Sequence, residues 1–212
     1  MDVREYLKSN IIVFDGAMGT MLQKKGLQAG DLPECLSITH PDTVLEIHRE
    51  YVLAGADIVT TNTFQACELK LEGSGYSVEE IVNAGVSLAK KSGARYTALD
   101  IGPTGQLLEP MGTLSFDKAY ELFKRQMIDG EKAGADLILI ETMSDLYEMK
   151  AAILAAKENT DLPVFATMTY QEDGRTFTGT DPLTGTITLQ SLGADALGVN
   201  CSMGPEELMP VV

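Results

Sequence analysis

The chain has 212 residues, of which 44% are hydrophobic and 22% are charged, a balance typical of a globular protein with a buried core. Its formal net charge of −15 argues against binding to nucleic acid or to an anionic membrane, because both need basic patches. No apolar run approaches the roughly 20 residues of a membrane helix, and the N-terminus lacks the basic-then-apolar pattern of a signal peptide. The three dispersed cysteines fit a reducing compartment, so we expect a cytoplasmic protein.

Six short apolar runs predict strands that are buried on both faces, as in a parallel sheet. They lie at residues 11–14, 57–61, 96–100, 137–141, 164–169 and 196–200. Helical spacing of apolar residues predicts helices between them, at residues 43–54, 78–91, 116–133 and 145–158. A weaker helical pattern covers residues 183–192, and a last helix begins within residues 204–212.

The tripeptide Gly-Ala-Asp occurs three times where a predicted helix stops and a predicted strand starts, at residues 55–57, 134–136 and 193–195. Glycine there supplies a left-handed helix stop, and the small alanine allows a tight turn into the sheet. The intervals are unequal, so the pattern is a repeated local solution and not a sequence repeat.

Strands that alternate with helices predict an α/β protein, either a doubly wound sheet or a (β/α)₈ TIM barrel. Residues 15–20 follow the first predicted strand but lack the full glycine spacing and the prompt helix of a dinucleotide-binding fold. We therefore favour the barrel. Such a barrel needs about 250 residues and eight strands, so we expect about six of the eight strand–helix units here. Residues 1–212 then form one barrel domain that is incomplete at its C-terminal end.

Polar residues follow the predicted strands at the ends where barrels place their sites. These ends read Asp15-Gly16, Thr61-Asn62-Thr63, residues 100–105, Glu141-Thr142, Thr169-Tyr170 and Asn200-Cys201-Ser202. An Asp before Gly is more often a turn residue than a functional one. Glu141 is a sharper candidate, because a carboxylate that closes so apolar a strand needs a partner or a ligand.

Cys201 is the candidate metal ligand or nucleophile, although a lone cysteine is more often a small buried hydrophobe. It stands at a strand end between two polar residues. The chain has no Cys-x-x-Cys pair, and the spacing of Cys35 and Cys67 does not join them to Cys201. His40 and His48 are interpreted as surface or packing residues.

Five motifs taken together resemble the homocysteine S-methyltransferase family, most of all the homocysteine-binding barrel of cobalamin-dependent methionine synthases. They occur in family order across nearly the whole chain. The motifs lie at residues 14–20 (FDGAMGT), 61–64 (TNTF), 100–105 (DIGPTG), 141–145 (ETMSD) and 198–202 (GVNCS).

The resemblance implies a (β/α)₈ barrel that activates the homocysteine thiol for methyl transfer and gives methionine. The family holds zinc with three cysteine thiolates, and Cys201 matches the one that follows the sixth strand. The other two form an adjacent pair after the eighth strand, which has no counterpart up to Val212. The resemblance also implies methylcobalamin on a separate module or chain, and corrinoid and folate modules as partners.

Further roles follow from the same resemblance. Asp15 and Glu141 are expected to accept hydrogen bonds from the ammonium group of homocysteine. Catalysis is assigned to Cys201 with its zinc. Backbone N–H groups of Gly16 and Ala17, together with the Asn62-Thr63 turn, are expected to take the substrate carboxylate, and Asn200 to shape the strand end beside the metal.

Three alternatives stay open. The first is a stand-alone homocysteine methyltransferase that uses betaine or S-methylmethionine. The second is an inactive, metal-free fragment, in which either other copies in a homo-oligomer cover the open sheet edges or the fold is rearranged. The third is a barrel of other chemistry such as an aldolase, against which the absence of lysine at the six strand ends argues.

Overall fold

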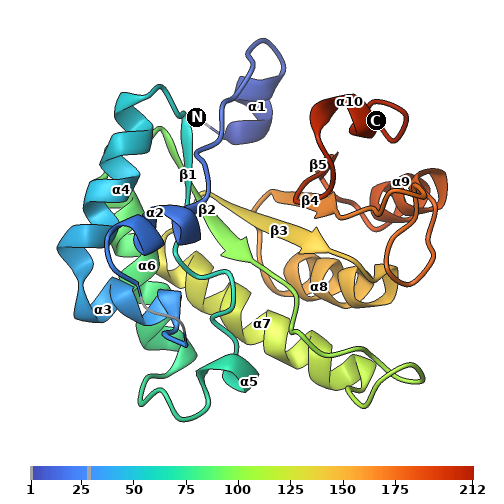
Figure 1. Cartoon of the computed structure of the whole chain (residues 1–212), viewed down its shortest axis with the longest axis horizontal. Helices are drawn as coiled ribbons and strands as arrows, with labels where there is room; N and C mark the ends of the chain where they lie inside the picture. The colour runs from blue at the N-terminus through green and yellow to red at the C-terminus, as the bar shows by residue number, and fades with distance from the viewer. Residues whose placement is uncertain (1, 28–29) are drawn as a thin grey trace.

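The computed structural model describes residues 2–27 and 30–212, and its strands and helices alternate along most of the chain (Figure 1). The strands are β1 (Ile58–Thr60), β2 (Tyr96–Ile101), β3 (Leu137–Met143), β4 (Val164–Met168) and β5 (Ala196–Val199). The longer helices are α4 (Pro41–Leu53), α6 (Val78–Lys91), α7 (Phe116–Ala133), α8 (Leu146–Asn159) and α9 (Pro182–Ser191). The shorter elements are α1 (Val3–Leu7), α2 (Met18–Lys24), η1 (Pro33–Cys35), α3 (Leu36–Thr39), α5 (Glu68–Leu71) and α10 (Pro205–Leu208).

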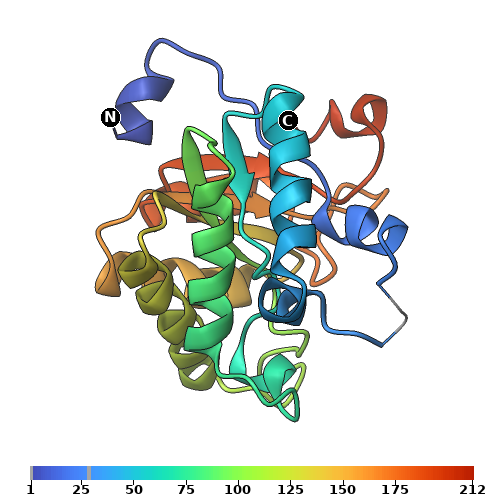
Figure 2. The ribbon, with the colours of Figure 1, turned by 90° about the vertical axis from the view of Figure 1, so that its left-hand side faces the viewer.

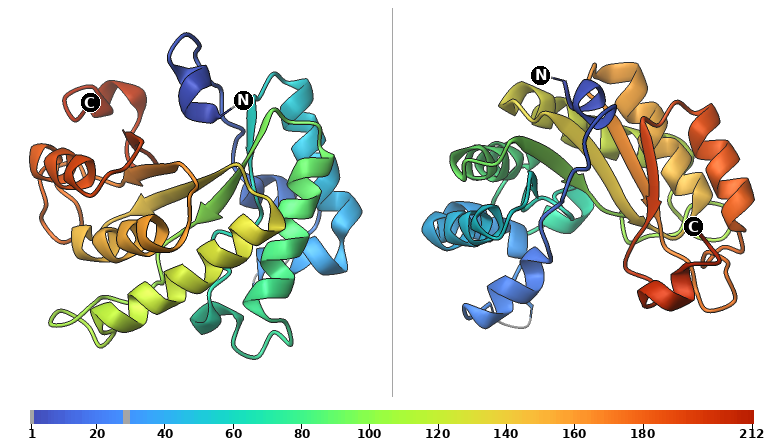
Figure 3. Two further views of the ribbon diagram at one scale, coloured as in Figure 1. Left: turned by 180° about the vertical axis from the view of Figure 1, so that it is seen from behind. Right: turned by 90° about the horizontal axis from the view of Figure 1, so that it is seen from above.

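Within the described residues, five strands form one parallel sheet in the order β1-β2-β3-β4-β5. The five longer helices cover its outer face, and each packs against its neighbours in the series (Figures 1 and 3). Figure 2 shows α4 and α6 side by side on this face. The arrangement is that of a TIM barrel, which confirms the predicted fold class, although the ring of strands is not closed among the described residues.

The predicted strand at residues 11–14 is wrong as a full strand. Phe14 makes a single parallel bridge to Ile58, and the Val13 carbonyl accepts the backbone N–H groups of Asp57 and Ile58. In the described part of the chain this segment has a neighbour on one side only, and Val13 is half exposed. The segment therefore occupies the place of a strand without a continuous ladder of hydrogen bonds.

The longer helices agree with the sequence pattern. The predictions at residues 78–91 and 116–133 match α6 and α7, whereas the helix expected within residues 204–212 covers only Pro205–Leu208. Helices α1, α2, α3 and α5 were not predicted, because four to seven residues are too few to show a helical period. No helix among residues 2–27 and 30–212 has the length and apolar character needed to cross a bilayer.

The glycines of the three Gly-Ala-Asp turns have the predicted left-handed backbone. Their φ angles are 108° at Gly55, 91° at Gly134 and 87° at Gly193. Side chains with a Cβ rarely adopt this conformation, so glycine ends each helix at low cost. The prediction of left-handed helix stops is confirmed.

The aspartates of these turns tie each new strand to the preceding segment of the sheet. In each pair the aspartate N–H donates to a backbone carbonyl at 2.7–2.9 Å, and the aspartate carboxylate accepts the N–H of the same residue at 2.8–3.1 Å. The pairs are Asp57 with Val13, Asp136 with Thr97, and Asp195 with Val164. These aspartate clamps fix where each strand begins relative to its neighbour.

Side chains alternate between the two faces of every strand, and the two faces bury different clusters. The outward side chains pack under the helices, for example Leu99, Ile138 and Ala166. The inward side chains, including Tyr96 and Leu139, form a smaller apolar cluster that α1 covers from the side where the strands begin. This alternation decides which residues face the inside of the barrel at the opposite end.

We predict that Asp136→Ala lowers the free energy of unfolding by about 1–3 kcal/mol, because it leaves the buried Thr97 N–H without its acceptor. Urea denaturation measures the loss. Asp136→Asn keeps an acceptor oxygen at the same place and is the matched control, so it should lose clearly less. Equal losses in the two variants would contradict the role of the clamp.

Candidate functional site

Polar side chains replace apolar ones at the last inward position of the strands. In the register of the sheet Asp100 lies opposite Leu139, and Glu141 is two residues further along β3 on the same face. The inward polar residues at the strand ends are Thr60, Asp100, Glu141 and Thr167, together with Asn200 directly after β5. They come from five separate segments, so the fold brings together groups that are up to 140 positions apart in the chain.

Two adjoining hollows open over these side chains, with volumes of about 460 and about 410 Å³. Both are lined by Ala17, Met18, Asp100, Glu141 and Cys201. The first also reaches Asp15, Gly16 and Asn200, and the second reaches Glu34, Asn62 and Thr142. We call the two hollows together the rim cleft.

All the site residues predicted from the sequence line the rim cleft except Thr63. Thr63 is fully buried, and its hydroxyl donates to the Asp100 carbonyl at 2.8 Å. Asn62 lines the cleft, but its amide nitrogen is directed away from it, to the Pro33 carbonyl at 2.7 Å and the Ser37 hydroxyl at 3.1 Å. The structure therefore gives Thr63 a supporting position behind the site.

Asp15 lies in the wall of the cleft, bound to the end of β1. Its carboxylate accepts the Thr60 backbone N–H at 2.9 Å and the Thr60 hydroxyl at 3.1 Å. Burial raises the pKa of Asp15 to about 7, against the lowering effect of the bonds from Thr60. Asp15 thus holds the segment before α2 against the end of β1, and it also lines the cleft.

Gly16 is required by a close approach. A Cβ at this position would lie 2.9 Å from the ring and hydroxyl of Tyr51, whose hydroxyl donates to the Ala17 carbonyl at 3.2 Å. A side chain at residue 16 would displace the Tyr51 ring and its bond to Ala17. Gly16 and Ala17 themselves line the first hollow.

Asn200 connects the ends of three strands. Its Oδ1 accepts the Thr142 N–H at 3.0 Å and the Thr167 hydroxyl at 2.9 Å. Its Nδ2 donates to Glu141 Oε2 and to the Thr142 hydroxyl, both at 2.9 Å, and lies 3.7 Å from Cys201 Sγ. The Glu141 carboxylate thus has the partner that its position at the end of an apolar strand demands.

Two residues beside this amide have left-handed backbones without being glycine, Thr142 with φ 61° and Cys201 with φ 49°. A β-branched residue rarely adopts this conformation, which costs on the order of 1–3 kcal/mol. The bond from the Thr142 N–H to Asn200 holds the strained turn, and the β3–β4 register is interrupted at the same place. Strain of this kind is concentrated at functional sites.

Cys201 is exposed at the edge of the rim cleft, which sets it apart from the buried Cys67. Within the described residues no three His, Cys, Asp or Glu side chains come together in a way that would hold a metal ion. One sulfur donor does not make a zinc site. The described residues therefore supply a single candidate ligand and do not by themselves fit the metal.

Two carboxyl groups at the cleft were not given a role by the sequence analysis. Asp100 Oδ1 and Glu34 Oε2 are buried, and neither has a hydrogen-bond partner in the described structure. The sequence could have indicated Asp100, because it lies near the end of a predicted strand. It also shares the inward face of β2 with Tyr96 and Ala98. Glu34 lies in the turn η1, and no local pattern marks it.

The charge of the cleft is one-sided. Its lining contains four carboxyl groups, those of Asp15, Glu34, Asp100 and Glu141, and no lysine, arginine or histidine among the described residues. Burial raises the pKa of each of the four. Such a site favours a ligand that brings its own positive charge.

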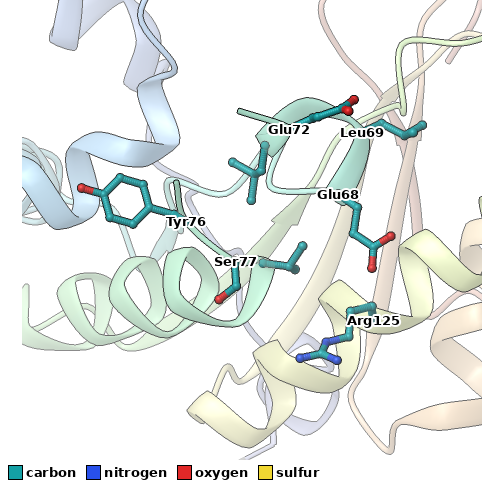
Figure 4. A pocket seen from close by; sticks show the side chains of 8 residues that line it. Glu68, Leu69, Glu72, Tyr76, Ser77 and Arg125 are labelled. Atoms are coloured by element: carbon teal, nitrogen blue, oxygen red, sulfur yellow. The ribbon is translucent and has the colours of Figure 1, made fainter. Parts of the chain in front are cut away.

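A separate hollow of about 540 Å³ lies near α5, the start of α6 and α7 (Figure 4). It is lined by Glu68, Tyr76, Ser77 and Arg125 among others. Arg125 is already engaged, with Asp129 at 2.7 Å and Glu79 at 3.2 Å. None of the strand-end residues lines this hollow, so we place the functional site at the rim cleft.

Comparison with known proteins gives a consistent result. Residues 12–212 match the family described as homocysteine S-methyltransferase. The chain is 33% identical to a methionine synthase of Mycobacterium tuberculosis and 31% identical to one of Mycobacterium leprae. Each match covers 98% of this chain, which spans 19% of the length of those relatives.

A solved structure shares the fold. The metallated form of the homocysteine methyltransferase MmuM from Escherichia coli superposes with a TM-score of 0.82 at 22% identity. The match covers 97% of this chain and 79% of that one. This likeness supports the TIM-barrel arrangement of the strands and helices.

We predict that Asp15→Asn reduces the loss of stability of the chain between about pH 4 and pH 7. The folded chain keeps the Asp15 proton up to about pH 7, whereas the unfolded chain releases it near the ordinary value of 3.8. The unfolded state therefore binds fewer protons in this window, and the group lowers stability as pH rises, by up to roughly 4 kcal/mol.

Urea denaturation across this pH range measures the effect. Asp181→Asn is a control of opposite sign, because hydrogen bonds from Thr184 lower the pKa of Asp181 at the start of α9. Its contribution is lost as pH falls. A pH profile of Asp15→Asn that coincides with that of the unchanged chain would contradict the burial of an Asp15 proton.

Proposed function

Because the chain belongs to the homocysteine S-methyltransferase family, we propose that it binds homocysteine in the rim cleft and activates its thiol for methyl transfer. The product is methionine. The observation that carries the proposal is the cleft itself, in which an acidic pocket without a basic side chain lies beside an exposed thiol. An amino acid that carries an ammonium group at one end and a sulfur at the other matches both features.

Asp15 and Glu141 are proposed to hold the ammonium group. Both line the first hollow, and charge-assisted hydrogen bonds from an ammonium to carboxylates are among the stronger polar contacts. Glu141 already accepts a bond from Asn200 at 2.9 Å on Oε2, which orients the carboxylate at the cleft wall. A bound cation also stabilises the ionised form of these buried groups.

The substrate carboxylate is proposed to bind the backbone N–H groups around Gly16 and Ala17. The cleft offers no arginine or lysine for this purpose among the described residues. Backbone N–H groups serve instead, since Gly16 and Ala17 line the first hollow. Asn62 contributes to the wall of the second hollow.

Cys201 is proposed as one ligand of a zinc ion whose other ligands lie outside the described residues. Zinc, when bound, supplies the deprotonation of a thiol that is otherwise mostly protonated at neutral pH. The contribution of this chain is to place the ammonium and carboxylate of homocysteine, so that its sulfur extends toward Cys201. Held in that position, the sulfur is oriented for in-line attack on a methyl group.

The methyl donor is proposed to be methylcobalamin on a separate module or chain. Residues 14–20 resemble the cobalamin-dependent branch of the family, and the relatives named methionine synthase are about five times as long as the matched segment. That length leaves room in those proteins for corrinoid and folate modules. A cytoplasmic location belongs to the same proposal.

We expect Glu141→Gln to weaken homocysteine binding about tenfold, because it replaces a charge-assisted hydrogen bond by a neutral one. Isothermal titration calorimetry measures the dissociation constant. Glu172→Gln, an exposed glutamate in the loop after β4, is the matched control and should bind as the unchanged chain does. Unchanged affinity in Glu141→Gln would remove this residue from the substrate site.

We expect Cys201→Ser to abolish zinc binding in the protein as the cell makes it, including any segments beyond these 212 residues. Metal analysis after dialysis gives the zinc content per chain. Cys35→Ser changes a half-buried thiol away from the cleft and should leave the zinc content as it was. Full zinc occupancy in Cys201→Ser would contradict the assignment of this ligand.

A further inference from the structure

Asp100 is held at the floor of the rim cleft by its backbone. Its N–H donates to the Thr61 hydroxyl at 3.0 Å, and its carbonyl accepts the Thr63 hydroxyl at 2.8 Å and the Gln126 amide at 3.5 Å. Thr61 and Thr63 also bond to each other at 2.6 Å. Three buried side chains are thus used to fix one strand residue, and the direction of the Asp100 side chain is fixed with it.

That side chain is directed into the cleft and is not satisfied there. Asp100 is 7% exposed, lines both hollows, and its Oδ1 is buried without a partner in the described structure. An ionised carboxylate in this position would be strongly unfavourable, since burial of an unpaired charge costs several kcal/mol. Asp100 must therefore take a cation or keep its proton.

The surroundings of Asp100 favour the proton. The charged groups that act on it are all acidic, namely Glu141, Asp15 and Glu34. No three acidic, histidine or cysteine side chains of residues 2–27 and 30–212 meet closely enough to hold a metal ion. Burial holds the pKa of Asp100 well above its ordinary range, and the three neighbouring carboxylates raise it further.

The neighbouring Glu141 is the better placed of the two carboxyl groups to carry the negative charge. Burial raises the pKa of both carboxyl groups, and Asp100, 7% exposed, is the more deeply buried of the two, since Glu141 is only partly buried. Of two like carboxyl groups in contact, one keeps the proton and the other carries the charge. Glu141 also receives the Asn200 Nδ2–H, a bond that favours the ionised carboxylate.

Building on the proposed function, we propose that Asp100 is a positioning residue of the ammonium subsite, which keeps a proton and donates it to Glu141. The pair then presents one negative charge, held between the Asp100 carboxyl and the Asn200 amide. One charge matches the single ammonium group of a neutral amino acid. The shared proton thus removes one of the four negative charges that the carboxyl groups of the rim cleft would otherwise carry together.

The first test needs no ligand. Carbon-13 label in the aspartate side-chain carboxyls gives one NMR signal per residue, and Asp100→Asn identifies the signal of Asp100 by its loss. We expect this signal to be that of a protonated acid at pH 7, with a midpoint far above the ordinary value of about 3.9. An ionised Asp100 at pH 7 would overturn the inference.

The second test separates positioning from a merely structural role. Asp100→Ala removes the donor, and we expect it to weaken L-homocysteine binding about tenfold in calorimetry. Asp100→Asn restores a neutral donor of the same shape and should recover affinity to within about threefold of the unchanged chain. Asn and Ala variants that are equally weak, while both remain folded by circular dichroism, would overturn the role.

The two tests also distinguish this inference from the proposed function. A protonated Asp100 in a chain that binds no homocysteine would contradict the proposed function but would still support the inference that Asp100 keeps a proton. An ionised Asp100 in a chain that binds homocysteine would contradict this inference alone. Should Asp100→Ala fail to fold, the NMR measurement on the unchanged chain still decides the protonation state.

Discussion

The register between neighbouring parallel strands is the constraint on which the whole site depends. Because side chains alternate, a slip by one residue would turn Asp100 and Glu141 toward the helices and bring Leu99 and Ile140 into the cleft. The aspartate clamps oppose such a slip by fixing where β1, β3 and β5 begin. Contacts at one end of the sheet therefore determine which side chains meet at the other end.

Sequence patterns predicted the parts of the fold that depend on local composition. Buried parallel strands are continuously apolar, so β1 to β5 were visible, and the Gly-Ala-Asp turns were recognisable because a left-handed stop requires glycine. The segment at residues 11–14 misled because its composition suits a strand, whereas a continuous ladder requires neighbours that the sequence does not reveal. Short helices such as α2 gave no period to detect.

The site was partly predictable for a similar reason. Position at a strand end and a matching motif identified Asp15, Glu141 and Cys201, and all three line the rim cleft. Thr63 carries the same signal, yet its hydroxyl is directed away from the cleft, to the Asp100 carbonyl. The sequence could not predict the direction of the Thr63 hydrogen bond, which depends on tertiary packing. The burial of Glu34 depends on it too, because this residue lies in η1 and not at a strand end.

Asn200 links the Glu141 carboxylate to the Cys201 thiol across the rim cleft. One amide nitrogen binds Glu141 at 2.9 Å and lies 3.7 Å from the Cys201 sulfur, while the oxygen of the same amide holds the turn at Thr142. The separation between the carboxylate and the thiol is thus set by a single planar group and not by a flexible loop. Under the proposed function, this amide would relate the ammonium subsite to the thiol and so act as a gauge of side-chain length. A sulfur one methylene nearer or farther would then miss the place where the chemistry is proposed to occur.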